Sequence, residues 1–180
     1  MQDAEFFNLY NHGLIRVAVG VPEVQVADPA FNGRRTIELM EKAEREKAVL
    51  ALFPELGLSA YSCDDLFHQQ VLLDGSLDSL RVILKASQAL NLVAVVGMPL
   101  QVDHLLFNCA VVLFRGKILG IIPKSFLPNY REYYEYRQFA PAAAACSTEV
   151  EIFDHSAIPF GSHLLFQADK QREFTFCVEI

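Results

Sequence analysis

Short, uninterrupted apolar runs recur along the first half of the chain, and they limit its possible folds more than any other feature of the sequence. Three of them lie at residues 15–19, 49–53 and 92–96. Pro54 stops the second run. Runs of about four to eight apolar residues bounded by such breaks are typical of strands that are covered on both faces. The pattern therefore predicts a sheet buried inside the molecule.

The segments between these runs have helical character. Asn32 stands where a helix cap is expected, ahead of a stretch that ends in the charged run 41–47. Farther along, most apolar residues between Leu77 and Leu90 fall on one helical stripe. Strand and helix thus alternate, and this order predicts an α/β fold.

A tight turn is expected in the second half of the chain. The apolar runs 107–114 and 117–122 are separated only by Arg115 and Gly116, which favours an antiparallel hairpin. A sheet that combines this hairpin with helix-linked strands is mixed. Further strand candidates lie at 149–153, 163–166 and 173–176.

Residues 125–141 differ from the rest of the chain. They are rich in Tyr, Arg and Glu and lack clean periodicity, which predicts a long ordered loop or a short helix. Loops of this kind commonly carry functional residues.

The composition excludes several classes of function. The chain has 180 residues, of which 52% are hydrophobic, enough for one packed domain. A formal charge of −7 argues against sequence-independent binding of nucleic acid or of an anionic membrane, because both need clustered cations. The longest apolar runs are far shorter than the roughly 20 residues that span a bilayer. We therefore expect no nucleic-acid or membrane partner.

Cysteine and histidine usage predicts a metal-free protein of a reducing compartment. The four cysteines include no C-x-x-C pair, and the five histidines show no zinc-binding spacing. The first residues lack the basic start and apolar stretch of a signal peptide. We therefore expect a cytoplasmic protein without a metal site. The chain also lacks G-x-G-x-x-G and Walker-type phosphate loops, so no nucleotide site is expected within it.

Three residues with useful chemistry each follow a predicted strand. They are Glu55, Lys124 and Cys177. Because strand ends of α/β sheets gather at one edge, these side chains are expected to converge. A thiolate, a carboxylate and an ammonium suit amide hydrolysis, as nucleophile, proton carrier and oxyanion stabiliser. Taken singly, each has a plainer interpretation, since such a Cys is usually part of a core and such a Lys is usually solvated.

The residues around these three carry a family resemblance. Residues 53–61, FPELGLSAY, resemble the glutamate motif of the nitrilase (carbon-nitrogen hydrolase) superfamily. Residues 124–132, KSFLPNYRE, resemble its lysine motif, and residues 177–179, CVE, resemble its nucleophile elbow. The resemblance implies a nitrilase-type αββα sandwich with mixed β-sheets, incomplete at the C-terminus of this chain.

Within the superfamily, the chain is most similar to the glutaminase domains of bacterial glutamine-dependent NAD synthetases. Segments 12–18, 26–32, 63–67 and 130–135 carry this closer likeness. It implies that glutamine is the substrate, and that its hydrolysis to glutamate supplies ammonia for NAD synthesis.

The same resemblance implies a role for each catalytic residue. Cys177 would be the nucleophile that forms a γ-glutamyl thioester, with Glu55 as general base and acid. Lys124 would stabilise the tetrahedral intermediate. The other cysteines are expected to be structural or to border the pocket without reacting: Cys63, Cys109 and Cys146.

Supporting residues follow from the same motifs. Tyr61 and Tyr130 match positions that shape the glutamine pocket. Glu132 and Glu135 both lie in the second-glutamate region of the superfamily. Of the two, Glu132 is expected to orient Lys124.

The resemblance also implies the cofactors and partners. The glutaminase reaction itself needs no cofactor, whereas ATP with Mg and deamidated NAD would bind a synthetase domain absent from this chain. Residues 1–180 would be the N-terminal part of the glutaminase domain, since the chain ends three residues after Cys177. The family typically self-associates, so a homo-oligomer is expected.

Two other functions stay open at this point. A free-standing amidase or carbamoylase of the superfamily would use the same three residues on another small amide. Alternatively, the chain is an inactive fragment, because a nucleophile at a strand-to-helix turn needs the following helix to hold it. A Ser-Gly-Gly-x-Asp-Ser loop in a second domain would favour the synthetase over the free-standing enzyme, and robust glutaminase turnover by the 180-residue chain would refute the inactive fragment.

Overall fold

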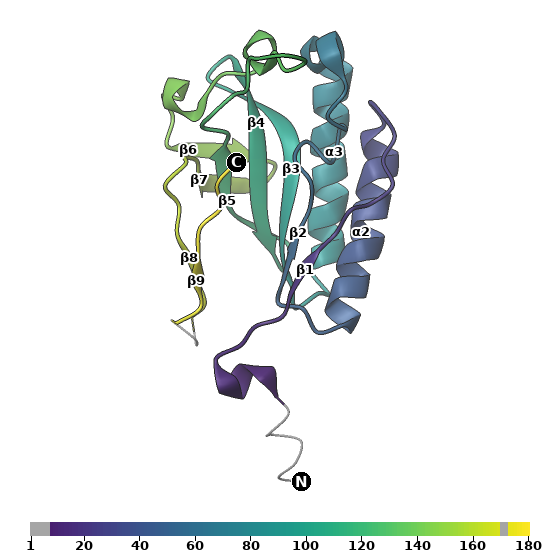
Figure 1. Cartoon of the computed structure of the whole chain (residues 1–180), viewed down its shortest axis with the longest axis vertical. Helices are drawn as coiled ribbons and strands as arrows, with labels where there is room; N and C mark the ends of the chain where they lie inside the picture. The colour runs from purple at the N-terminus through teal and green to yellow at the C-terminus, as the bar shows by residue number, and fades with distance from the viewer. Residues whose placement is uncertain (1–7, 170–172) are drawn as a thin grey trace.

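The central element of the structure is a five-stranded sheet in the order β1-β2-β3-β4-β5 (Figure 1). The structure is a computed structural model that describes residues 8–169 and 173–180. The strands are β1 (Val17–Val19), β2 (Leu50–Leu52), β3 (Val93–Val102), β4 (Leu105–Phe114) and β5 (Lys117–Pro123). The first three are parallel, and β4 and β5 are added antiparallel. The prediction of a mixed sheet is confirmed.

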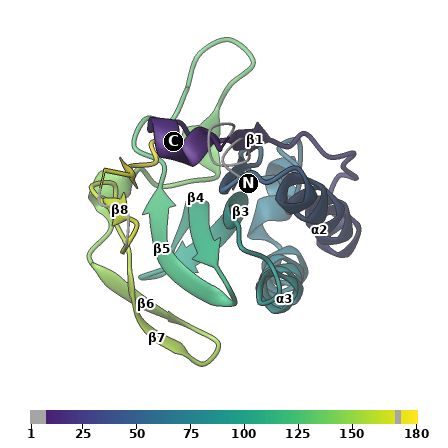
Figure 2. The same cartoon turned by 90° about the horizontal axis from the view of Figure 1, so that it is seen from below.

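Two helices, α2 (Pro29–Arg45) and α3 (Gln70–Ser87), cover one face of this sheet (Figure 1, Figure 2). The carboxylate of Asp28 caps α2 by accepting a hydrogen bond from the Phe31 N–H at 2.9 Å. The expectation that Asn32 is the cap is wrong, because Asn32 lies inside α2 and is fully buried. The helix begins earlier because Pro29 favours the first helical position.

Two tight turns join the last three strands of the sheet. Arg115 and Gly116 have φ of 48° and 79°. Positive φ at both positions is what a type I′ hairpin turn requires, and the hairpin predicted at these residues is confirmed. Asp103 and His104, with φ of 52° and 64°, form a similar turn between β3 and β4. This second hairpin is not expected from the sequence.

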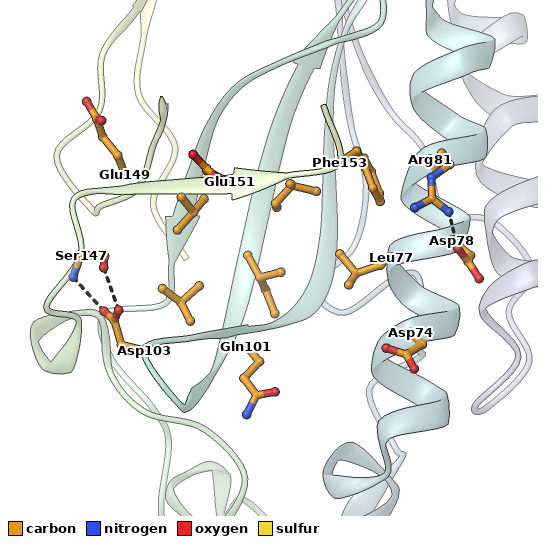
Figure 3. Close-up of a pocket in the computed structure, with 14 residues that line it drawn as sticks. Asp74, Leu77, Asp78, Arg81, Gln101, Asp103, Ser147, Glu149, Glu151 and Phe153 are labelled. Atoms are coloured by element: carbon orange, nitrogen blue, oxygen red, sulfur yellow. Dashed lines mark hydrogen bonds and ion pairs between the residues drawn. The ribbon is translucent and has the colours of Figure 1, made fainter. Parts of the chain in front are cut away.

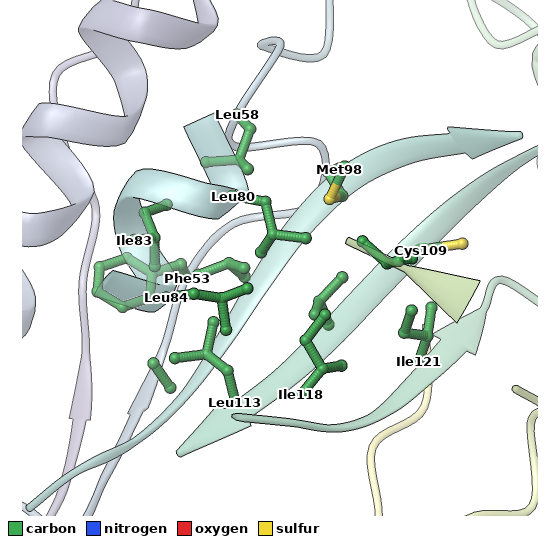
Figure 4. Packing of buried hydrophobic residues seen from close by; sticks show 14 of the residues in the cluster. Phe53, Leu58, Leu80, Ile83, Leu84, Met98, Cys109, Leu113, Ile118 and Ile121 are labelled. Atoms are coloured by element: carbon green, nitrogen blue, oxygen red, sulfur yellow. The ribbon is translucent and has the colours of Figure 1, made fainter. Parts of the chain in front are cut away.

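The main core lies between the helices and the sheet. Figure 4 shows Leu80, Ile83 and Leu84 of α3 directed at Phe53 and Leu113, and all five side chains are buried. Full burial of such a side chain contributes about 1.5–3 kcal/mol. The apolar stripe predicted between residues 77 and 90 is therefore the face with which α3 packs on the sheet.

The opposite face of the sheet is covered by C-terminal segments. β8 (Phe166–Gln167) pairs antiparallel with β9 (Thr175–Phe176). Phe166 is buried against a cluster that includes Ile122, and Val178 packs against the same cluster. Figure 2 shows β8 on the side of the sheet away from the helices.

The remaining elements are short. β6 (Glu149–Ile152) and β7 (His155–Pro159) form a separate hairpin. The strand candidate at 149–153 corresponds to β6, and the candidate at 173–176 contains β9. The candidate at 163–166 overlaps β8 only at Phe166, and β7 is not expected. The 3-10 turns in the described residues are η1 (Leu9–His12), η2 (Asp64–His68), η3 (Glu135–Arg137) and η4 (Ala142–Ala144).

The α/β class expected from the sequence is confirmed, with one helical layer on one face of a mixed sheet in the described residues. Over the same residues, no helix is both long enough and apolar enough to cross a membrane. The first seven residues, part of the stretch that lacks signal-peptide features, lie outside the described part of the chain.

Candidate active site

Glu55 follows β2 after Phe53 and Pro54, and it begins a tightly folded loop. Leu56 and Ala60 in this loop have left-handed backbone φ of 52° and 68°. Such conformations cost free energy and persist only where the surroundings impose them. Here the Leu58 N–H donates to the Gly97 carbonyl at 3.1 Å, which ties the loop to β3. The loop therefore holds Glu55 in a fixed place at the end of the sheet.

Asn32 of α2 supports the same loop from the helical side. Its side-chain amide donates to the Leu58 carbonyl at 3.0 Å and to the Gln25 carbonyl at 2.8 Å. Its Oδ1 accepts from the Gln25 N–H at 2.7 Å. The residue expected to cap the helix therefore supports the loop that begins at Glu55.

Lys124 follows β5 and places its ammonium between two carboxylates. Its Nζ lies 2.7 Å from Glu55 Oε1 and 3.0 Å from both carboxylate oxygens of Glu135. The side chains of Lys124 and Glu135 are only 10% and 6% exposed, so water screens this pairing weakly. Burial opposes the charge, but the hydrogen bonds donated to Glu55 and Glu135 outweigh it and raise the pKa of Lys124. Lys124 therefore stays a cation.

The glutamate that contacts Lys124 is Glu135 rather than Glu132. Glu135 opens η3 and is buried, whereas Glu132 is exposed. In the described residues, the contact with Lys124 that was expected of Glu132 is made by Glu135. The cause is the path of the loop, because the Glu135 N–H donates to the Pro128 carbonyl at 3.1 Å and this contact turns residue 135 inward.

Tyr61 joins this cluster, and Tyr130 lies at its edge. The Tyr61 hydroxyl donates to Glu135 Oε1. Burial and this hydrogen bond raise the pKa of Tyr61, because both disfavour a phenolate beside a carboxylate. Tyr133 packs edge-on against Tyr61 with ring centroids 6.5 Å apart, and against Tyr130 at 5.8 Å.

A cavity of about 320 Å³ opens beside these residues. Tyr61, Glu132 and Glu135 are among the residues that line it. The volume is in the range of small-molecule sites, and a few polar groups on a partly aromatic wall are typical of them.

Asn108 belongs to the site although it is not among the residues expected from the sequence. It lies in β4 and is fully buried, and its Nδ2 donates to Glu55 Oε1. Its backbone carbonyl accepts from the Lys124 N–H at 2.8 Å. The sequence signal was a single amide inside an otherwise apolar strand, a position where an unpaired polar group is costly.

Cys177 lies on the last extended segment of the chain. Phe176, Val178 and Ile180 pack on the face of the sheet away from the helices, while Cys177 between them is exposed and carries a free thiol. The Ile180 carbonyl accepts a hydrogen bond from the Ser125 N–H at 3.1 Å. The C-terminus, marked in Figure 1, therefore lies beside the loop that follows β5.

The structure thus brings together two of the three predicted catalytic residues. Glu55 and Lys124 form an ion pair. Among residues 8–169 and 173–180, no hydrogen bond or ion pair links Cys177 to either of them. The convergence of all three side chains stays a prediction.

The other cysteines differ in exposure. Cys63 and Cys109 are buried, and Cys146 is exposed. Burial raises the pKa of the Cys63 and Cys109 thiols, which disfavours the thiolate that a nucleophile needs. In the described part of the chain, no group of three or more His, Cys, Asp or Glu side chains could hold a metal ion.

Comparison with known proteins identifies the family of this chain. The sequence profile of the carbon-nitrogen hydrolase family matches residues 16–161. The chain belongs to the carbon-nitrogen hydrolase family. The chain is 41% identical over 175 residues to the glutamine-dependent NAD(+) synthetase of Mycobacterium tuberculosis, and this match covers 97% of the chain and 26% of that relative. It is 31% identical over 157 residues to the synthetase of Rattus norvegicus, with 83% of the chain and 22% of the relative covered.

The chain spans about a quarter of the length of these curated relatives. Among solved structures, it matches a glutamine-dependent NAD(+) synthetase from Cytophaga hutchinsonii with a TM-score of 0.77 at 22% identity, over 86% of this chain and 26% of that one. It matches an amidase from Nesterenkonia sp. with a TM-score of 0.59 at 21% identity, over 71% and 48% of the two chains. At these identities the likeness establishes the fold alone, and the nitrilase-type α/β fold is confirmed.

A larger cavity, about 790 Å³, lies between α3 and β6. Figure 3 shows Arg81 paired with Asp78 beside the ring of Phe153 on its wall. None of the expected site residues lines it. The smaller cavity, which is lined by Tyr61, Glu132 and Glu135, is therefore the candidate substrate site, although Glu55, Lys124 and Cys177 do not line it.

Proposed function

We propose that this carbon-nitrogen hydrolase releases ammonia from glutamine for the synthesis of NAD. The observation that carries the proposal is the buried ammonium of Lys124, held 2.7 Å from Glu55 and 3.0 Å from Glu135. The 41% identity to glutamine-dependent NAD(+) synthetases over 97% of the chain supports glutamine as the amide.

The proposed chemistry proceeds through a thioester on Cys177. Glu55 takes the thiol proton as the sulfur attacks the side-chain carbonyl carbon of glutamine, and Lys124 stabilises the oxyanion. When the carbon–nitrogen bond breaks, Glu55 gives its proton to the leaving nitrogen, which departs as ammonia. Water then attacks the thioester and passes a proton through Glu55 to the sulfur, which yields glutamate and the free thiol.

The pocket and the partners complete the proposal. Tyr61 lines the proposed glutamine pocket, and Tyr130 shapes it through its contact with Tyr133. The pocket needs no cofactor of its own. The ammonia is used by a synthetase domain outside these 180 residues, where ATP with Mg and deamidated NAD bind. Residues 1–180 form the N-terminal part of a glutaminase domain that assembles as a homo-oligomer in the cytoplasm.

The decisive experiment is Cys177→Ala in the full-length protein, assayed for NAD formation with glutamine or with free ammonia as nitrogen donor. Glutamine-dependent synthesis should vanish while ammonia-dependent synthesis survives. Loss of both activities would indicate a folding role for Cys177, and loss of neither would exclude it as the nucleophile. Cys146→Ala, at another exposed cysteine, is the matched control and should retain both activities.

A free-standing amidase or carbamoylase is the alternative, since the same fold occurs in the Nesterenkonia amidase. Initial rates with glutamine, acetamide, propionamide and an N-carbamoyl amino acid distinguish the two. A higher kcat/KM for any of the simple amides than for glutamine would favour the alternative.

A further inference from the structure

Asn108 is the one described residue that hydrogen-bonds both Glu55 and Lys124. Its Nδ2 donates to Glu55 Oε1, and its backbone carbonyl accepts from the Lys124 N–H at 2.8 Å. The residue is fully buried in the interior of β4. Because β4 pairs with strands on both of its sides, the position of this amide is set by the sheet.

The two side-chain donors that reach Glu55 meet on the same oxygen. Lys124 Nζ and Asn108 Nδ2 both bond to Oε1, and in the described residues no bond reaches Oε2. The Glu55 side chain is 31% exposed, so the carboxylate is not sealed on all sides. Oε2 is therefore the oxygen that can exchange a proton with the reacting groups.

Lys124 alone cannot fix the orientation of this carboxylate. An ammonium is a compact charge on a flexible stem, and here it is shared with both oxygens of Glu135 at 3.0 Å. A planar amide anchored in a strand is a directional donor. Asn108 therefore supplies the geometric constraint that the ion pair lacks.

The side-chain oxygen of Asn108 shows that holding Glu55 in this way costs stability. Asn108 Oδ1 is buried and has no hydrogen-bond partner among the described residues. Leaving a buried acceptor unpaired is destabilising, and an apolar side chain of similar volume would avoid the penalty. The amide cannot simply turn round, because Oδ1 would then face a carboxylate oxygen. The useful group at this position is the Nδ2 donor.

We propose that Asn108 is a positioning residue that holds Oε1 of Glu55 and leaves Oε2 free to carry the proton of the amide-cleavage reaction. This inference rests on the proposed function, because it assigns how Glu55 acts in that reaction. Asn108 itself touches neither the nucleophile nor the substrate in this role.

The proposal predicts a change in the pH profile. A donor to the carboxylate favours its charged form, so removal of Asn108 Nδ2 should move the acid limb of the kcat/KM profile to higher pH. The other charged or titratable groups that act on Glu55 are Lys124, paired with Glu135, and Tyr61. These remain in place in an Asn108 variant.

The experiment compares Asn108→Leu and Asn108→Ala with the wild-type protein. Both variants remove the donor without adding a charge, and Asn108→Ala introduces a smaller side chain in case the leucine disturbs folding. We expect kcat for glutamine hydrolysis to fall about 10- to 100-fold with KM changed less than about threefold. The acid limb of kcat/KM should move to higher pH by about 1 unit in both variants.

Cys109→Ala is the matched control. Cys109 lies next to Asn108 on the same strand, is equally buried and packs in the core on the helical side. The Cys109→Ala substitution should lower the free energy of unfolding without moving the acid limb of the kcat/KM profile. An unshifted acid limb in both Asn108 variants, or a loss of kcat no greater than that of the control, would overturn the proposal.

A readout without substrate separates this inference from the proposed function. The ¹³C chemical shift of the Glu55 carboxyl carbon, measured at neutral pH, should differ from the wild-type value in both Asn108→Ala and Asn108→Leu, because the hydrogen bond from Nδ2 is lost. If glutamine is not hydrolysed but this change is present, the proposed function fails and the positioning of Glu55 stands. If glutamine is hydrolysed and this change is absent, the proposed function stands and the positioning role of Asn108 fails.

Discussion

Gly97 of β3 and Glu55 approach each other so closely that a Cβ at position 97 would lie 2.9 Å from the Glu55 Cα, and 2.5 Å from the Leu56 nitrogen. Backbone atoms cannot yield to such a contact as the end of a flexible side chain can. β3, the strand next to β2, therefore limits where the Glu55 backbone can lie.

Gly97→Ala is expected to push the Glu55 loop out of place. Overpacking of this kind costs about 1–3 kcal/mol of unfolding free energy. We expect glutaminase kcat/KM to fall by at least about tenfold, since small displacements of a catalytic group are expensive. Gly161→Ala is the control, because a Cβ there meets nothing within 4 Å. The free energy of unfolding in urea and the initial rate are measured for both variants. Equal values would contradict this role of Gly97.

The choice between the two glutamates of the Tyr-rich loop can be tested directly. Glu135→Gln removes a buried negative charge that pairs with Lys124, so kcat should fall about 10- to 100-fold. Glu132→Gln changes an exposed residue at the cavity wall and should affect KM more than kcat. Steady-state kinetics with glutamine measure both effects. A larger loss of kcat in Glu132→Gln would reverse the assignment.

Lys124→Met should reduce stability in a manner that depends on pH. Removal of the ammonium leaves the buried Glu135 carboxylate unpaired, and breaking a buried pair costs on the order of 3 kcal/mol. Because the pKa of Lys124 is raised in the folded protein, its stabilisation is fully present below the ordinary lysine value of about 10.4. It is lost as the pH rises through the higher value of the folded state.

Denaturant unfolding of the wild type and Lys124→Met between neutral and strongly alkaline pH measures this difference. The gap in unfolding free energy should be constant below the ordinary lysine pKa and should shrink above it. A gap that widens with rising pH would contradict the sign of the shift.

An exposed set of contacts links the two loops that flank the candidate substrate cavity. The Arg137 guanidinium donates twice to the Asp65 carboxylate at 2.9 Å, and the Tyr134 hydroxyl donates to Asp64 at 2.8 Å. Arg137→Gln should loosen the loop, raise KM for glutamine and speed proteolytic cleavage between residues 126 and 136. Arg131→Gln, at an exposed arginine of the same loop, is the control. Equal cleavage rates in the two variants would show that the ion pair does not hold the loop.

The features that sequence alone determined depend on residues near one another in the chain. Arg115 and Gly116 predicted a hairpin because positive φ at two adjacent positions is a local requirement. Pro54 marked the end of a strand, and the motif around it identified Glu55 as a candidate. Family membership follows from the same local motifs, and the match over residues 16–161 confirms it.

Only the tertiary structure decided which side chains meet. Glu132 and Glu135 lie three residues apart in the sequence, and the fold of the loop buries one and exposes the other. Contacts such as that of Tyr61 with Glu135, 74 positions apart, depend on how distant segments pack together. Gly97 and Asn108 act on Glu55 from neighbouring strands for the same reason. The local sequence pattern cannot specify such pairings, because the contacts that stabilise them form only when the sheet has assembled.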